Sequence, residues 1–142
     1  MADKRQVEYH EMKLQFVVVK NLRLLLPPEV VWWYVNNGGK TNADRIKNFK
    51  LGEHPGASDL MVFWNRTLLC PEIKVRKSEL YGIPRTTDQS KDQKDFQALI
   101  EAQGGYYEVC RSVDEVMGFL TRHGVPTRET APLRSASLGV TA

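Results

Sequence analysis

The order of apolar and polar positions along the chain predicts alternating helices and strands. Apolar residues recur at helical spacing at Leu14, Val18, Leu22 and Leu25, in a stretch without Gly that ends at Pro27. Runs of β-branched and aromatic residues bounded by Gly, Pro or Asn predict strands instead. The predicted elements, in order, are a helix at 7–26, a strand at 30–35, a short basic helix at 42–51, strands at 59–64 and 68–75, a helix at 90–103, a strand at 106–110 and a helix at 112–123.

This succession predicts a single α/β domain. A chain of 142 residues, 42% of them hydrophobic, suffices for one core and therefore for one site. We expect the domain to span residues 1–124. After Gly124 the chain is rich in Ser, Thr, Arg and Pro and has no apolar periodicity, so we predict a disordered tail at 125–142.

Composition indicates where the protein is located more clearly than it indicates what the protein does. The net charge of +3 favours an anionic partner, without distinguishing nucleic acid from an acidic protein or a membrane surface. Cys70 and Cys110 lie in separate apolar runs, which indicates neither a disulfide framework nor a zinc-ligand pair. The longest apolar tract, at 24–35, is broken by Pro27 and Pro28, and the charged N-terminus is unlike a secretory signal. We therefore expect a soluble, cytoplasmic protein.

The candidate chemistry lies at Asp59 and in the triplet Glu72-Ile73-Lys74. Glu72 and Lys74 are two positions apart in a predicted strand, so they share one face of it. Asp59 begins the neighbouring strand of the same hairpin, so its carboxylate can approach Glu72. Two converging carboxylates suit Mg²⁺ or Mn²⁺, which activates water for phosphodiester hydrolysis, while Lys74 would hold that water or the charged transition state. A Glu-x-Lys triplet also arises by chance, because both residues are common.

Glu11 lies on the same side of its helix as Val18 and Leu22, which is the predicted core side. An inward carboxylate is costly unless something pairs with it, and a bound metal ion would be such a partner. The alternative is that Glu11 lies near the first turn and only interacts favourably with the helix dipole.

Gln93 is likewise an amide on the buried side of its helix, close to the position of Phe96. There it would orient Lys74, a water molecule or a phosphate. It is also the third residue after Ser90, and this spacing is typical of a capping box. The two roles are compatible.

Several spaced motifs occur together in one order. They are Asn36-Asn37-Gly38-Gly39, Gly52-x-x-Pro55-Gly56-x-x-Asp59-Leu60, Glu72-Ile73-Lys74, Ser90-x-x-Gln93-x-x-Phe96, and the run from Gly104 through Ser112-Val113-Asp114-Glu115-Val116. This set resembles the virus-type replication-repair nuclease (VRR-NUC) domain of the PD-(D/E)xK phosphodiesterases, over about residues 8–120. The resemblance implies an αβββαβ core with a central mixed β-sheet flanked by helices, divalent metal held by carboxylates, and cleavage of branched or flapped DNA.

The resemblance also implies roles for individual residues. Asp59 and Glu72 match the metal ligands of the family, Lys74 its catalytic lysine and Gln93 its helix glutamine. These four form the catalytic set. Glu11 matches the metal-binding glutamate of the N-terminal helix, and the backbone carbonyl of Ile73 is expected to ligate the metal as in similar sites.

Pro71 departs from the family pattern, in which an apolar residue able to donate to the sheet usually precedes the glutamate. Proline removes a strand hydrogen bond and therefore suits edge strands and bulges. We expect Pro71 to mark such an edge or bulge and to affect how Glu72 is aimed.

Basic residues flank the proposed metal site on both sides in the sequence. There they would hold phosphates on either side of the scissile bond, with binding that is independent of sequence and weakened by salt. The alternative for each is a solvated cation on a polar face. They are Lys40, Arg45, Lys47 and Lys50 before Asp59, and Arg76, Lys77 and Arg85 after the Glu72–Lys74 strand.

Together these features predict a Mg²⁺- or Mn²⁺-dependent DNA endonuclease that selects DNA structure as Holliday-junction resolvases do, in replication, repair or recombination. Cutting both strands of a junction needs two active sites, so we expect a homodimer on branched DNA, associated with nucleoid or phage DNA. One alternative is a module that binds DNA structure without cutting it. Another is a flap or nicking endonuclease of phage replication or defence.

Overall fold

The computed structural model describes residues 4–36, 41–76 and 88–128, with side chains from Tyr9 onward. It is a mixed α/β fold, and the order of its elements confirms the order predicted from the sequence. None of the helices in these ranges has the length and apolar character needed to cross a membrane. The elements are α1 (Lys4–Leu25), β1 (Val31–Tyr34), α2 (Asn42–Lys50), β2 (Leu60–Trp64), β3 (Thr67–Ile73), α3 (Lys91–Ala102), β4 (Tyr106–Cys110) and α4 (Val113–Arg122).

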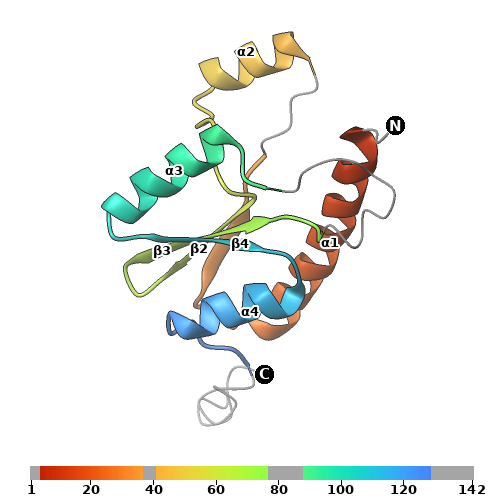
Figure 1. Cartoon of the computed structure of the whole chain (residues 1–142). Coiled ribbons are helices and arrows are strands. Elements are labelled where there is room, and N and C mark those ends of the chain that lie inside the picture. The colour runs from red at the N-terminus through yellow and green to blue at the C-terminus, as the bar shows by residue number, and fades with distance from the viewer. Residues whose placement is uncertain (1–3, 37–40, 77–87, 129–142) are drawn as a thin grey trace.

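The four strands form one mixed sheet in the order β1-β2-β3-β4. The first two pairs are antiparallel, and β3 and β4 are parallel. The predicted hairpin between β2 and β3 turns at Asn65 and Arg66, whose φ angles are +48° and +63°. Two consecutive positive φ values match the twist of a two-residue hairpin. Figure 1 shows α3 over one face of the sheet, with α4 and α1 on the other side.

The pleat of β3 sends successive side chains to opposite faces of the sheet. Leu69 and Ile73 face α1 and α4, where they join the larger apolar cluster, called here the main core. Cys70 and Glu72 point to the α3 side. The main core consists of Val18, Leu22, Leu26, Val30, Leu60, Val62, Leu69, Ile73, Cys110, Val116, Phe119, Leu120 and Val125. The α3-side cluster consists of Ala57, Cys70, Phe96 and Tyr107.

Packing against the main core continues past the domain boundary that we placed after Gly124. Val125 and Thr127 are buried, and the Arg128 N–H donates to the Leu25 carbonyl at 2.6 Å. Ordered packing therefore reaches at least residue 128. The rest of the predicted tail, residues 129–142, lies outside the described residues, as does the polar segment at 77–87.

Candidate active site

The structure brings the two predicted carboxyl groups together. Asp59 immediately precedes β2 and Glu72 lies in β3. The carboxyl group of Glu72 hydrogen-bonds to that of Asp59. The second link is from the backbone, because the Ile73 N–H donates to Asp59 Oδ2 at 2.8 Å. Asp59, at the start of β2, is thus held against β3 by two hydrogen bonds.

This contact is made where β2 and β3 separate. Their ladder runs from the Trp64–Thr67 pair to the Val62–Leu69 pair and ends there. Beyond it, the N–H groups on the β2 side of β3 belong to alternate residues, which are positions 71 and 73. The Ile73 N–H donates to the Asp59 carboxylate, which therefore occupies the place of a backbone carbonyl of β2.

Pro71 lies just past the end of the β2–β3 ladder, where a continued register would place it opposite Leu60. Its missing N–H falls on the β2 side, after the pairing with β2 has ended. We expected Pro71 to mark an edge strand or a bulge. It marks no edge strand, since β3 lies between β2 and β4, and it is found instead where the pairing of β3 with β2 has ended. Proline at this position is compatible with the opening that admits the Asp59 carboxylate.

Gly56 places the loop before Asp59 against the first turn of α3. Its φ is +77°, and a Cβ there would lie 2.1 Å from the Asp92 carbonyl oxygen and 2.7 Å from the Gln93 nitrogen. Only glycine allows such a close approach of two backbones. The Gly56-x-x-Asp59 spacing thus has a physical reason, because it holds Asp59 and Gln93 in one site.

Gln93 contacts Glu72 rather than Lys74. Its Nε2 donates to Glu72 Oε1 at 3.0 Å, while its Oε1 accepts the Ser90 N–H at 2.9 Å. Ser90 Oγ in turn accepts the Gln93 N–H at 3.2 Å, so the predicted capping box is confirmed. One amide therefore caps α3 and fixes one oxygen of Glu72.

Burial controls the ionisation of the carboxyl pair. Glu72 is 3% exposed. Its burial, followed by the neighbouring charge of Asp59, raises its pKa to about 10, and Lys74 opposes this shift. Burial also raises the pKa of Asp59, although its hydrogen bond with Glu72 opposes that rise. Burial therefore makes both carboxyl groups of the pair harder to ionise than a free carboxyl group.

The donor chemistry of this pair fits a hard divalent cation. Glu72 Oε2 is buried, and apart from the Asp59 carboxyl group no described residue is hydrogen-bonded to it. A cation that displaced the shared proton would bind this oxygen. The Ile73 carbonyl, which points the same way as its N–H, faces the same side of β3. In the described ranges no three His, Cys, Asp or Glu side chains form a ready ligand cluster, and Mg²⁺ commonly binds one or two carboxylates while keeping several waters.

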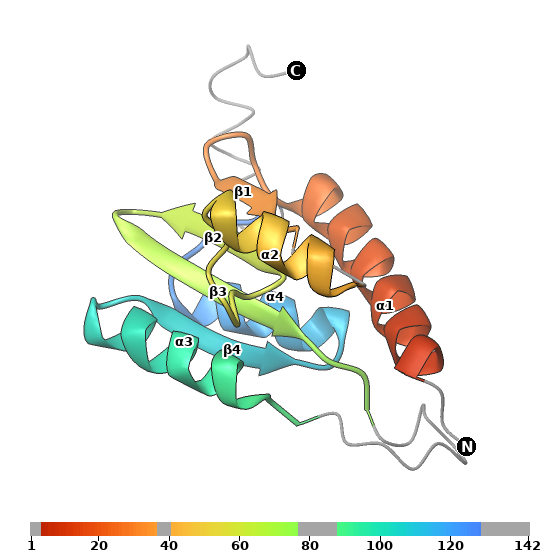
Figure 2. The ribbon, with the colours of Figure 1, turned by 90° about the horizontal axis from the view of Figure 1, so that it is seen from above.

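Lys74 and Glu11 lie within electrostatic reach of the pair. The charge of Lys74 lowers the pKa of both carboxyl groups, as expected for a cation on the same side of the chain as Glu72. The charge of Glu11 raises the pKa of Glu72, as the smallest of its causes. Figure 2 shows the N-terminal half of α1 at the same end of the sheet as the carboxyl ends of β3 and β4.

The predicted phosphate-binding cations are placed in two regions. Arg45, Lys47 and Lys50 are exposed on α2, which Figure 1 shows standing away from the sheet on the side of α3. Arg76 forms an ion pair with Glu115 at 3.1 Å. The others, Lys40, Lys77 and Arg85, lie outside the described residues.

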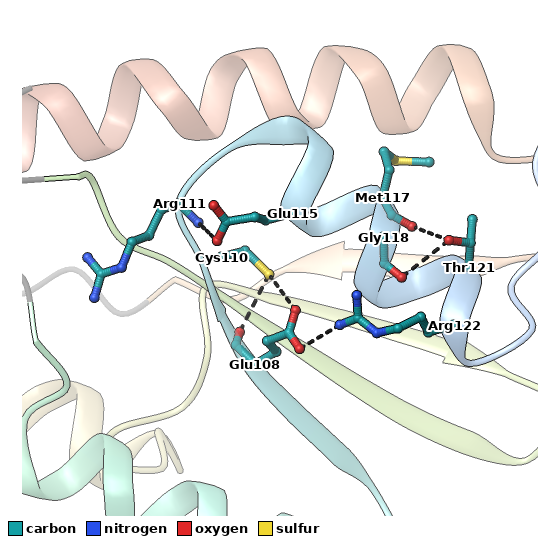
Figure 3. Close-up of polar contacts among 8 residues, drawn as sticks. All are labelled: Glu108, Cys110, Arg111, Glu115, Met117, Gly118, Thr121 and Arg122. Atoms are coloured by element: carbon teal, nitrogen blue, oxygen red, sulfur yellow. Dashed lines mark hydrogen bonds and ion pairs between the residues drawn. The ribbon is translucent and has the colours of Figure 1, made fainter.

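Sequence reasoning missed Arg111, which follows β4. Its Nη1 donates to the Val75 carbonyl at 2.9 Å, and its backbone N–H donates to Glu115 Oε1 at 3.1 Å (Figure 3). Glu115 therefore does not complete a capping box with Ser112, which accepts only the Glu115 N–H. Arg111 therefore contacts the backbone of Val75, the residue that follows Lys74. The sequence could have indicated Arg111 in one way. It is a basic residue at the carboxyl end of a predicted strand, and this is where ligands bind in parallel sheets.

No family model, curated protein or solved structure matches this chain in comparisons with known proteins. What is established is the mixed α/β fold with the Asp59–Glu72 pair at the point where β2 and β3 separate. The likeness to VRR-NUC domains rests on the spaced motifs of the sequence.

Proposed function

We propose that this chain is a divalent-metal-dependent DNA endonuclease with a PD-(D/E)xK core, related to VRR-NUC domains. The observation that carries the proposal is the buried contact between the carboxyl groups of Asp59 and Glu72, with the charge of Lys74 beside them. Apolar replacements would stabilise the fold better than two carboxyl groups that share a buried proton. Perturbed groups of this kind concentrate at functional sites.

The residues of the chain have separable tasks in this proposal. When bound at Asp59, Glu72 and the Ile73 carbonyl, Mg²⁺ or Mn²⁺ lowers the pKa of the attacking water and offsets charge on the phosphoryl oxygens. The Ile73 N–H and the Gln93 amide hold one oxygen of each carboxylate before substrate arrives, which limits the reorganisation needed during the reaction. Lys74 holds the water or stabilises the developing negative charge.

The proposed substrate is branched DNA, and the proposed active form is a homodimer. Arg45, Lys47 and Lys50 on α2 offer exposed cations to the phosphate backbone. Three large apolar side chains are exposed on the adjacent strands β1 and β2: Val31 (55%), Phe63 (45%) and Trp33 (44%). Val31 is paired with Phe63. Such a patch supports contact with a second copy.

The alternative of a module that binds DNA without cutting it was motivated by Pro71. Asp59 and Glu72 are in contact next to Pro71, so this proline gives no reason for the carboxyl pair to be separated. We therefore do not propose this alternative, and the assay below includes its outcome.

The test is cleavage of labelled four-way junction, flap and linear duplex DNA by the full chain in Mg²⁺, Mn²⁺ or EDTA. Asp59→Asn and Lys74→Ala are compared with Asp114→Asn and Lys94→Ala, which change exposed residues of α4 and α3. We expect cutting that requires metal, is lost in the first two variants and persists in the controls. Tight DNA binding without cutting in any metal would contradict the proposal, and gel filtration with light scattering checks the dimer.

A further inference from the structure

Lys74 lies where the backbone pairing of β3 with β4 ends. The ladder runs to the Ile73–Cys110 pair, and one more bond follows it, in which the Lys74 N–H donates to the Cys110 carbonyl at 3.1 Å. Among the described residues, no further backbone hydrogen bond joins the chain after Lys74 to the chain after Cys110. The proposed catalytic lysine is therefore the last residue of this segment that backbone pairing holds in place.

Beyond Lys74, side chains make the contacts between the two segments. Arg111 Nη1 donates to the Val75 carbonyl at 2.9 Å. Glu115, in the first turn of α4, accepts the Arg111 N–H with Oε1 and Arg76 Nη2 with Oε2, each at 3.1 Å. Figure 3 shows the guanidinium of Arg111 directed away from Glu115, so the two ends of this residue make different contacts. Arg111 and Glu115 thus hold both residues that follow Lys74.

The bond from Arg111 is the stronger of these side-chain contacts. The side chains of the Arg76–Glu115 pair are 52% and 40% exposed, and such exposed pairs contribute little. Arg111 is half-buried, and Val75, whose carbonyl it binds, is fully buried. A hydrogen bond from a charged donor is stronger than one between neutral groups. The path of the chain after Lys74 therefore depends more on Arg111 than on Arg76.

The direction of the Lys74 side chain depends on the backbone on either side of it. Successive side chains of an extended chain point to opposite faces, so the burial of Val75 on one face directs Lys74 to the other, where Glu72 lies. The backbone between the Lys74 N–H and the Val75 carbonyl has only a few rotatable bonds. Since Cys110 binds one end of it and Arg111 the other, these bonds have little freedom to rotate.

We propose that Arg111 is a positioning residue for Lys74 and acts through the Val75 carbonyl. It fixes the backbone of Lys74, so that the ammonium group stays beside the Asp59–Glu72 pair before substrate arrives. A displacement of about 1 Å at a reacting group can slow a reaction about a hundredfold. For its effect on cleavage this inference rests on the proposed function. The effect of Arg111 on the backbone of Lys74 is independent of it.

The test compares Arg111→Met and Arg111→Lys with Arg122→Met in the full-length chain. Methionine removes the charge and the donor but keeps an unbranched side chain, and lysine restores both. Arg122 is the matched control, because it also joins α4 to β4, but through an ion pair with Glu108 at 2.6 Å. Hydrogen exchange of the Lys74 amide is followed by NMR in EDTA, with the amides of β2 as the reference for global unfolding. Single-turnover cleavage of four-way junction DNA and the affinity for DNA are measured separately.

We expect Arg111→Met to speed exchange of the Lys74 amide about tenfold relative to the amides of β2, the size expected from the loss of one hydrogen bond. The single-turnover rate of cleavage should fall about tenfold to a hundredfold while the affinity for DNA stays unchanged. Arg111→Lys should restore part of both, and Arg122→Met should change neither.

Unchanged exchange of the Lys74 amide in Arg111→Met would overturn the effect on the backbone. Faster exchange with an unchanged cleavage rate, in a chain that cuts DNA, would overturn the positioning role. Weaker and less salt-dependent DNA binding, with an unchanged cleavage rate at saturation, would also overturn it, because Arg111 would then be a phosphate contact. If the wild type cuts no DNA in Mg²⁺ or Mn²⁺, the proposed function fails and the positioning role with it, and faster exchange would still support the effect on the backbone.

Discussion

The two faces of the sheet differ in what they bury. The face under α1 and α4 packs the thirteen apolar residues of the main core. Among the described residues the α3 face packs four, including Tyr107, and the buried carboxyl group of Glu72 lies beside them. One face supplies most of the apolar burial that stabilises the fold, so the other can hold groups that cost stability. Natural proteins accept such costs mainly at functional sites.

Removing a large side chain from each face tests this difference most strongly. Phe119 lies in the main core and Phe96 in the α3-side cluster, 1% and 5% exposed. We expect Phe119→Ala to lower the free energy of unfolding by about 3–5 kcal/mol, and Phe96→Ala by less, because fewer buried neighbours surround Phe96. Denaturant titration measures both. An equal or larger loss in Phe96→Ala would show that the faces contribute alike.

Gly56→Ala should be the most damaging single-methyl change on the α3 face. Gly52 is the control, since its φ is +97° but a Cβ there meets nothing within 4 Å. Gly52→Ala should cost about 1 kcal/mol from backbone strain alone. Gly56→Ala should cost about 1–3 kcal/mol more, because its Cβ would overlap the Asp92 carbonyl.

Gly56→Ala should also displace Asp59 from Glu72 and reduce DNA cleavage, whereas Gly52→Ala should not. Equal stability and activity in the two variants would mean that the close approach between this loop and α3 is dispensable.

Glu72→Gln should stabilise the metal-free protein by roughly 1–2 kcal/mol at pH 7–8 while removing activity. The ordinary pKa of Glu72 is 4.5, and in the folded chain it is raised to about 10. Between these values the unfolded chain has lost the proton that the folded chain retains. Stability of the wild type in EDTA should therefore fall as pH rises through this window.

The pH series in EDTA should show a flatter profile for Glu72→Gln than for the wild type. Some slope will remain, because the pKa of Asp59 is also raised. A destabilised variant with an unchanged slope would show that Glu72 is not the buried acid that limits stability on this face.

Arg76→Ala should have the smallest effect. Its ion pair with Glu115 joins two side chains that are 52% and 40% exposed, and such surface pairs contribute at most about 1 kcal/mol. If Arg76 contacts a phosphate, the slope of log affinity for DNA against log salt should fall by about one. A titration of DNA binding at several salt concentrations measures it, and an unchanged slope would remove Arg76 from the DNA-binding set.

The parts of this structure that the sequence predicted depend on local pattern. Helical and strand periodicity predicted the element order, including the two consecutive strands whose hairpin brings Asp59 close to Glu72. Ser90 and Gln93 predicted the start of α3 through their capping spacing.

The features that the sequence did not predict depend on contacts between different elements. They are set by where β2 and β3 separate and by which residues of neighbouring elements come into contact. Pro71 was interpreted as a sign of an edge strand or a bulge, because the neighbours of a strand cannot be inferred from that strand alone. The bond of Gln93 to Glu72 joins α3 to β3, and the spacing of residues within α3 does not identify a partner on another element. Arg111 directly follows β4, and the sequence gives no sign of its contact with Val75 until the pairing of β3 with β4 is known.

The most direct test of the central claim is an anomalous difference map from a crystal of the protein grown with Mn²⁺. The proposal expects one strong peak or a close pair at Asp59 and Glu72, about 2.0–2.3 Å from carboxylate oxygens, and no peak there in Glu72→Gln. A wild-type map with no peak at these residues, from protein that cuts DNA in Mn²⁺, would contradict the claim that this carboxyl pair holds the catalytic metal.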